Sequence, residues 1–185
     1  MDMRKTAIFT IGLILIAAIS FADHGRVVKS TPGDEIQMQV YFSPRGGCTA
    51  AIVDAIQAAK TEVLVQAYSF TSTPIAKALV DAHKRGVHVE IVLDRSQRST
   101  KKYGSADFTA HAGIPTYIDA AHAIAHNKIM VIDKSIVITG SFNFTKAAET
   151  NNAENLLLIR SKELAKTYIE NWERHKEHSE RYEGR

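Results

Sequence analysis

The stretch EVLVQAYSFTSTPIAKALVDAHKRGVHVEIVLD, residues 62 to 94, specifies the centre of the architecture. It opens with β-branched, apolar and aromatic residues, which predict a largely buried strand over 62–70. A proline in the first turn, apolar residues at helical spacing and Gly86 as a stop predict a helix over 73–85. A second strand follows over 87–94. A strand, a helix and a strand at this spacing form a crossover unit, which predicts parallel pairing.

Further elements are expected on both sides of this unit. Alternating or apolar runs predict additional strands at 36–44, 114–119, 128–133, 135–140 and 154–160. Helices are expected at 49–60, as a short element before residue 114, and as a long charged element after residue 160. The strands at 128–133 and 135–140 are joined so tightly at Lys134 and Ser135 that they form an antiparallel hairpin. The expected fold class is therefore α/β, with a mixed, mainly parallel β-sheet sandwiched by helices.

The first 22 residues differ from the rest of the chain. A short basic start is followed by a 14-residue apolar run, 6–19, and then by the small residues Ser20 and Ala22. This layout is typical of a secretory signal, and the run is short for a membrane-spanning helix, which needs about 20 apolar residues. We expect a signal peptide at 1–22, or an N-terminal anchor if it is not cleaved, and a single domain at 23–185. The protein is then expected to be periplasmic or secreted, or membrane-anchored if the signal remains.

Charge and cysteine content limit what the protein can be. The chain has 23 Lys and Arg and 20 Asp and Glu; removing Arg4, Lys5 and Asp2 with the first 22 residues leaves 21 against 19. Such a weak excess does not by itself indicate a nucleic-acid partner, so any electrostatic attraction must be local. Cys48 is the only cysteine, which excludes a scaffold held by internal disulfides.

The stretch HNKIMVIDKSIVITGSFNFT, residues 126 to 145, gathers polar residues at fixed spacing, and a glutamate follows eleven residues after its asparagine. In order, these residues are His126, Lys128, Asp133, Gly140, Ser141, Asn143 and Glu154. The pattern resembles the HKD motif of the phospholipase D superfamily. The lead-in AYSFTSTPIAKALVDAHKRGVHVEIVLD is similar to the small bacterial members with one motif per chain, the Nuc-type endonucleases. The resemblance runs from about Gln39 to the start of the last helix, and it implies the phospholipase D-like fold.

These residue types suit the hydrolysis of a phosphodiester. Residues two apart in an extended strand share a face, so His126 and Lys128 can both point at one phosphate. Imidazole can attack phosphorus and form a phosphohistidine, while the ammonium group stabilises the phosphoryl oxygens. Ser141 and Asn143 add neutral donors, and Gly140 permits a close backbone approach.

This inventory lacks an acid for the leaving oxygen, because no second H-x-K occurs in the chain. Larger members of the superfamily bring two such motifs together at one site, so a chain with a single copy needs a two-fold homodimer. His126 of one subunit would attack while the partner's His126, protonated, donates to the leaving oxygen. Two coupled imidazoles predict a two-limbed pH profile with an optimum at neutral or mildly acidic pH. Glu154 is expected to orient an imidazole, and the resemblance implies a structural role for Asp133.

The sequence predicts no metal and no cofactor. His122 lies four residues before His126, but the intervening segment runs into a strand and does not favour a ligand pair. No cluster of carboxylates suggests magnesium or calcium. The expectation is activity in excess chelator.

The substrate must be inferred from the surroundings of the phosphate site. The basic loop 95–104 follows the carboxyl end of a strand, and its predicted substrate-binding residues are Arg95, Arg98, Lys101 and Lys102, with Tyr103 beside them. Such a loop suits a polyanion, although it could also be a solvated surface loop.

Three functions remain open. The first is a nonspecific endonuclease acting on single- and double-stranded DNA, with RNA left open. The second is a phospholipase D-type lipid hydrolase, for which AAHAIA at 120–125 is the candidate apolar surface. The third is a noncatalytic nucleic-acid-binding module. Phe142 is expected in the core, whereas Phe144 is a candidate to pack against a base or a lipid chain.

Overall fold

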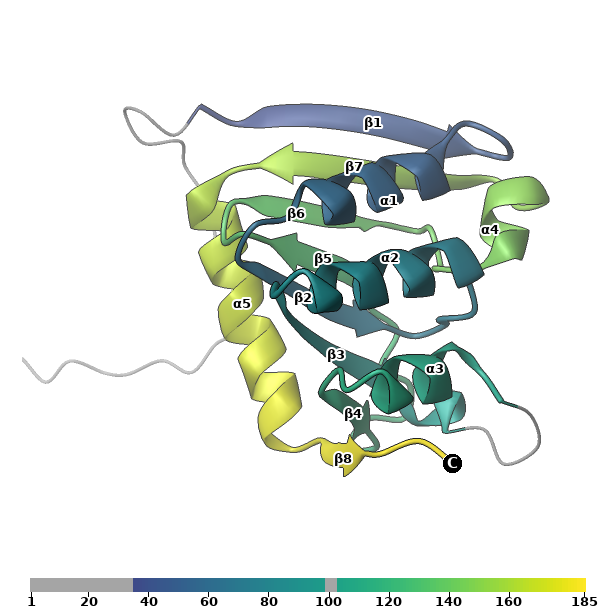
Figure 1. Cartoon of the computed structure of the whole chain (residues 1–185). Helices are drawn as coiled ribbons and strands as arrows, with labels where there is room; N and C mark the ends of the chain where they lie inside the picture. Colours follow the sequence, from purple (N-terminus) through teal and green to yellow (C-terminus); the bar gives the residue numbers. More distant parts are fainter. Residues whose placement is uncertain (1–34, 99–102) are drawn as a thin grey trace, which may run out of the picture.

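The computed structural model describes residues 35–98 and 103–185 (Figure 1). The expected signal peptide at 1–22 and the predicted substrate-binding residues Lys101 and Lys102 lie outside these ranges. Within the two ranges, no helix is both long enough and apolar enough to cross a membrane.

One eight-stranded sheet forms the centre of the molecule, in the order β1-β7-β6-β5-β2-β3-β4-β8 (Figure 1). Its strands are β1 (Gln37–Ser43), β2 (Glu62–Ala67), β3 (His88–Asp94), β4 (Thr116–Asp119), β5 (Lys128–Ile132), β6 (Ile136–Gly140), β7 (Glu154–Arg160) and β8 (Glu180–Tyr182). The strands predicted from the sequence are all present, and the short strand β8 is an addition.

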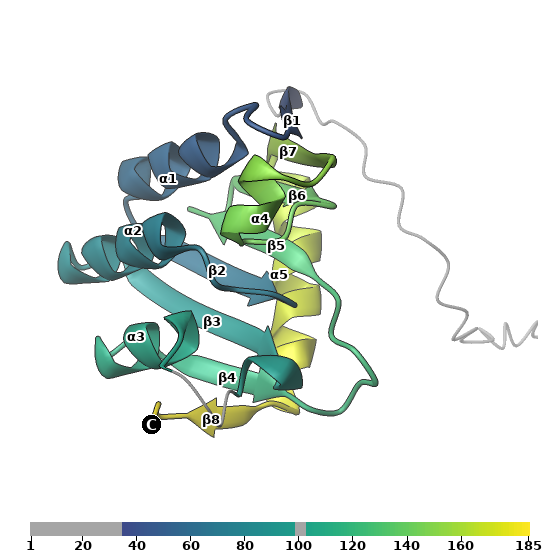
Figure 2. The ribbon, with the colours of Figure 1, turned by 90° about the vertical axis from the view of Figure 1, so that its right-hand side faces the viewer.

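Helices cover both faces of the sheet, as predicted. Figure 2 shows α1 (Cys48–Ala58), α2 (Thr73–Lys84) and α3 (Ser105–His111) on one face and α5 (Lys162–Glu177) on the other. The short α4 (Lys146–Thr150) and the single 3-10 turn η1 (Arg95–Gln97) were not predicted. The two faces therefore differ, because three helices line one and a single long helix crosses the other.

The prediction of a mainly parallel sheet is wrong. Only the pairs β2–β3 and β3–β4 are parallel, and the other five pairs are antiparallel. Each parallel pair needs a crossover helix, which α2 and α3 supply. β6 follows β5 through a tight turn, and β7 and β8 follow the helices α4 and α5. Each of these three strands runs antiparallel to its neighbour. The hairpin of β5 and β6 turns at Asp133 and Lys134, which both have positive φ.

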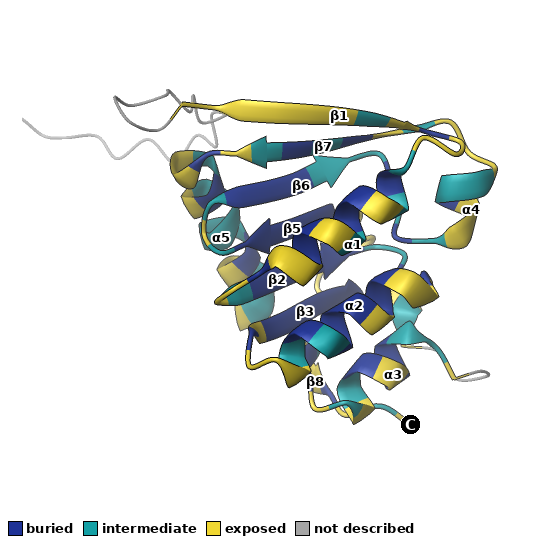
Figure 3. Ribbon diagram, turned by 45° about the horizontal axis from the view of Figure 1, so that its top comes forward, coloured by how far each residue is buried: buried dark blue, intermediate teal, exposed yellow. Residues whose placement is uncertain are grey.

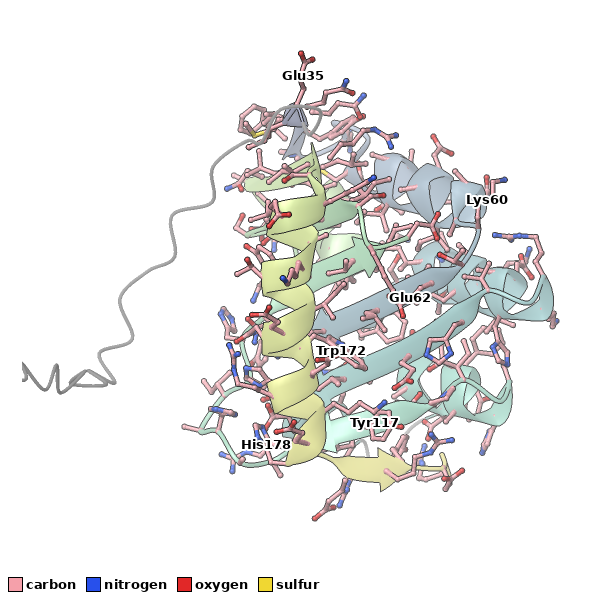
Figure 4. The ribbon with its side chains drawn as sticks, turned by 90° about the vertical axis from the view of Figure 1, so that its left-hand side faces the viewer. Glu35, Lys60, Glu62, Tyr117, Trp172 and His178 are labelled. Carbon is pink, nitrogen blue, oxygen red and sulfur yellow. The ribbon has the colours of Figure 1, made fainter. Side chains whose placement is uncertain are left out.

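Two apolar clusters hold the helices to the sheet (Figure 3). The larger cluster lies under α1, α2 and α3 and includes the fully buried rings of Phe142 and Phe144. Phe144 therefore cannot pack against a base or a lipid chain, which corrects the expectation for it. The smaller cluster lies under α5, where the indole Nε1 of Trp172 donates to the carbonyl of Val65 at 2.9 Å. Figure 4 shows Trp172 on α5, against the strands.

Candidate active site

His126 and Lys128 lie where the chain enters β5, at the same edge of the sheet as the end of β2. β5 begins at Lys128, so His126 precedes the strand and is exposed. The backbone N–H of Tyr68 donates to the carbonyl of Asn127 at 2.7 Å and extends the pairing of β2 with β5. The ring of Tyr68 lies 4.6 Å from the ring of His126 and 5.2 Å from Lys128 Nζ, so one side chain contacts both.

The ammonium group of Lys128 is nearly buried, with 8% of the residue exposed. Its Nζ donates to the carbonyl of His126 at 3.0 Å. Burial lowers the pKa of Lys128, and the negative charge of Glu154 opposes this effect. Within residues 35–98 and 103–185, no carboxylate forms an ion pair with Lys128. A phosphate group would supply the missing anion.

The segment after β6 brings a hydroxyl and an amide to the site. Gly140 has φ +143°, and a Cβ there would collide with the carbonyl oxygen of Asn155 on β7. The N–H of Ser141 donates to that carbonyl at 3.1 Å, and the Ser141 hydroxyl accepts from the N–H of Asn155 at 3.0 Å. The hydroxyl proton of Ser141 is therefore left to donate to a ligand. The Oδ1 of Asn143 is buried and has no hydrogen-bond partner in the described part of the chain.

Glu154 begins β7 and lies close enough to Lys128 to influence it electrostatically. Its backbone N–H donates to the Ser43 hydroxyl at 3.1 Å, and its carboxylate accepts from Asn152 Nδ2 at 3.1 Å. No hydrogen bond joins Glu154 to His126 within the described ranges of one chain, so its orienting role stays a prediction.

Asp133 lies in the turn at the other end of β5. Its carboxylate accepts hydrogen bonds from the backbone N–H groups of Lys60, Thr61 and Glu62, and from the Thr61 hydroxyl at 2.9 Å. Burial raises the pKa of this carboxyl, but these hydrogen bonds outweigh it and hold the pKa below its usual value. Asp133 thus ties the β5–β6 turn to the start of β2, at the opposite end of β5 from Lys128.

The two described arginines of the predicted substrate-binding set are held by neighbours. Arg95 Nη2 donates to the carbonyl of Ala123 at 2.9 Å, and Arg98 forms an ion pair of 2.6 Å with Glu180 on β8. A hollow of about 560 Å³ lies between η1 and α3, and exposed Tyr103 and Phe108 line it.

Sequence reasoning missed two groups of residues. Tyr68 contacts both His126 and Lys128, and no signal in the sequence pointed to it, because it lay within the strand predicted over 62–70. The second group joins Asp119 and His122 to His175, in the last turn of α5, and to His178, just after α5. The i, i+3 spacing of these two histidines was a signal, but the partners are more than fifty residues away in the sequence.

Comparisons with known proteins identify the family and the fold. Residues 52–176 match the family described as cardiolipin synthase, PLD-like domain. A Rickettsia bellii protein named phospholipase D is 38% identical over 176 residues, which is 86% of this chain and 87% of that protein. The crystal structure of Nuc from Salmonella typhimurium, titled a phospholipase D family member, has a TM-score of 0.75 at 41% identity and covers 80% of this chain and 99% of its own. NucT from Helicobacter pylori, at 23% identity with a TM-score of 0.71, covers 80% of this chain and all of its own, and it shares the fold.

Proposed function

Because this chain belongs to the phospholipase D-like family, a family of phosphodiesterases, we propose that it is a nonspecific endonuclease that hydrolyses DNA without a metal ion. Single- and double-stranded DNA are the proposed substrates, and RNA is a further candidate. A noncatalytic binding module is not proposed, because family membership and a filled motif both favour an enzyme.

One observation carries the catalytic part of the proposal. An exposed imidazole, His126, lies beside a nearly buried ammonium group, Lys128, and Tyr68 contacts both. A buried cation without a paired carboxylate is costly unless an anion completes it. A phosphodiester would provide that charge and place its phosphorus next to the imidazole.

The reaction would proceed in two displacements. In the first, a ring nitrogen of His126 forms a bond to phosphorus, the bond to the leaving oxygen breaks, and the partner subunit's His126 gives its proton to that oxygen. In the second, water attacks phosphorus and gives a proton to the partner subunit's His126, while the bond between phosphorus and the first His126 breaks. Lys128, Ser141 and Asn143 would stabilise the phosphoryl oxygens in both steps.

The surface of β1 supports the proposed homodimer. Met38, Val40 and Phe42 are all exposed, and Phe42 has 66% of its surface open. Figure 3 shows most of β1 in the colour of exposed residues. They lie opposite Ile159, Leu157 and Asn155 of β7, so they share the α5 face of the sheet. An apolar row of this kind on a strand favours a covering partner. Because Ser43 ends β1 opposite Glu154, a second copy seated there would lie near the phosphate site.

The surroundings of the site favour a polyanion. Arg95 is exposed beside the hollow between η1 and α3, and Tyr103 could stack on a base there. Arg98 is also exposed, although its ion pair with Glu180 reduces the positive charge that it can offer to a ligand.

A lipid hydrolase is the second candidate. Ile124, in the apolar stretch 120–125, has 57% of its surface exposed two residues before His126. The Rickettsia relative is named phospholipase D, which also favours a lipid diester.

We further propose that residues 1–22 act as a secretory signal, because of their basic start and apolar run. The domain at 23–185 would then work in the periplasm or outside the cell, or at the membrane if the signal remains. N-terminal sequencing of protein recovered from the periplasm tests this, and an intact Met1 in that fraction would contradict cleavage.

The deciding experiment offers the purified protein plasmid DNA and phosphatidylcholine vesicles, in EDTA and over a range of salt. We expect DNA cleavage that falls steeply with salt and is reduced about 10³-fold or more in His126→Ala. Activation by vesicles with no salt dependence would favour the lipid hydrolase instead.

The control keeps a misfolded variant from being mistaken for an inactive one. His126 is exposed, so His126→Ala should have the circular dichroism spectrum and melting temperature of the wild type. Equal DNA cleavage by this folded variant would sink the proposal.

A further inference from the structure

Three histidines and one aspartate meet at the far end of α5. Asp119 is the last residue of β4 and is buried, and His122 follows it in the loop. His175 lies in the last turn of α5 and His178 just beyond it, where Figure 4 labels it. These four side chains come from two segments that are distant in the sequence, and the packing of α5 across the sheet brings them together.

The ring nitrogens converge on one oxygen. His175 Nδ1 lies 2.7 Å, His122 Nδ1 3.1 Å and His178 Nε2 3.3 Å from Asp119 Oδ2. The potential ligand atoms of all four residues lie within 4.8 Å of one another. Ligand atoms on a tetrahedral zinc ion lie about 3.3 Å apart, because the metal–ligand bonds are about 2.0–2.1 Å long. The three nitrogen–oxygen distances are therefore close to the spacing of two ligand atoms on one zinc ion.

A purely ionic cluster explains this arrangement less well. One carboxylate can neutralise one imidazolium, whereas three imidazolium ions with ring centres 4.8–5.4 Å apart would repel one another. Lys176, which lies between His175 and His178 in the sequence, forms an ion pair with Glu90 instead. Three neutral imidazoles and one carboxylate are a complete ligand set for a divalent ion, and His122 and His178 leave the site open to solvent.

We propose that Asp119, His122, His175 and His178 form a structural binding site for a divalent transition-metal ion, with Zn²⁺ as the favoured ion. Imidazole nitrogens suit zinc, copper and nickel, and a four-coordinate site of three nitrogens and one oxygen favours zinc. On binding, each facing ring nitrogen turns its lone pair to the ion, and the ring proton resides on the other nitrogen. Because four protein ligands fill a tetrahedron, the ion would have a structural role.

The site would fix the approach to His126. His122 lies four residues before His126, and the loop between them is otherwise held by hydrogen bonds to residues at the end of β3. Asp94 accepts from the N–H of Ala125 at 2.7 Å, and Arg95 donates to the carbonyl of Ala123. An ion at His122 would add a third anchor that joins this loop to α5. In the sequence His122 lies near His126, whereas its partners His175 and His178 are more than fifty residues away.

The test titrates Zn²⁺ into the full chain without an affinity tag, after removal of bound metal by a chelator and dialysis. Calorimetry should give one ion per chain, and the melting temperature should rise with the ion. His178→Gln should bind at least about tenfold more weakly. A histidine outside the cluster, His83, provides the matched control, so His83→Gln should bind as the wild type does.

A spectroscopic measurement on the wild type removes any dependence on how the variants fold. Co²⁺ in the zinc position of the wild type should give the intense visible absorption of a tetrahedral ion. Absence of stoichiometric binding, a pale octahedral spectrum, or equal affinity in His178→Gln would overturn the proposal and leave a hydrogen-bonded cluster only. Since the ion is structural, phosphodiester hydrolysis at low temperature should survive chelation. The metal site can therefore be refuted without refuting the proposed function, and the reverse also holds.

Discussion

Lys128 and His126 are two residues apart, yet they occupy very different environments. The lysine is nearly buried between Tyr68 and the sheet, whereas the histidine is exposed at the edge. The buried ammonium is unfavourable for the free protein and favourable once a phosphate is bound. The same residue should therefore lower stability and raise activity.

Replacing Lys128 with methionine separates these two effects. Methionine keeps most of the side-chain length and removes the charge, so Lys128→Met should melt at or above the wild-type temperature. Its activity should fall about 10²- to 10³-fold, because the phosphoryl oxygens lose their cation. Thermal melts and initial rates check this. Lys146 is exposed on α4, so Lys146→Met serves as the control and should change neither quantity.

Asp133 provides a stability prediction with a defined pH dependence. Its pKa is lowered in the folded protein, so its contribution is present above about pH 4 and is lost as the pH falls through the folded pKa. Asp133→Asn keeps a residue that tolerates φ +50° and removes the charge. We expect a loss of about 1–3 kcal/mol in the free energy of unfolding at neutral pH. Urea melts of both proteins should converge in acid, and a gap that widened there would contradict the prediction.

The junction of β6 and β7 is the tightest backbone contact in the site. Gly140→Ala would force a Cβ against the carbonyl of Asn155 and disturb the paired hydrogen bonds of Ser141. Gly86 also has positive φ, but a Cβ added there would meet nothing within 4 Å. Gly86→Ala therefore measures only the free-energy cost of an alanine at positive φ. Gly86→Ala should cost roughly 1 kcal/mol and keep full activity. Gly140→Ala should cost more and lose activity, and equal behaviour of the two in melts and assays would argue against a close-approach role.

Local elements were predictable from the sequence, and distant pairings were not. The crossover of β2, α2 and β3 follows from contiguous patterns, and the motif residues meet because β5, β6 and β7 are neighbours in the chain. The antiparallel pairing of β2 with β5 joins segments separated by two other strands, so nothing local specifies its direction. The strand β8 has only three residues after a long charged helix, which leaves no pattern to detect.

The same reasoning explains the candidate sites. His126 and Lys128 could be identified because they belong to a longer motif that resembles the phospholipase D superfamily. Tyr68 joins them only through the β2–β5 pairing. His122 and His178 meet only because α5 ends over β4, an arrangement that emerges from packing of the whole chain.

The proposed dimer would connect the exposed face of β1 with the proposed phosphate site. Phe42→Glu places a charge in the apolar row and should shift the protein to a monomer with little activity, as sedimentation and rate measurements at several concentrations would show. Phe108 is also exposed but lies on α3, so Phe108→Glu should remain dimeric.

Subunit mixing tests the shared site itself. Heterodimers of wild type and His126→Ala should be almost inactive, because each site needs both imidazoles. Half the activity in such mixtures, or full activity in a dilute monomer, would refute the division of labour between the two histidines.

The chain has a single tryptophan, and Trp172 is held by α5 against the carbonyl of Val65. Its fluorescence emission is consequently a built-in reporter for one event, the detachment of α5 from the strands. A red shift that precedes the loss of circular dichroism would mark that helix as the first part of the molecule to come away.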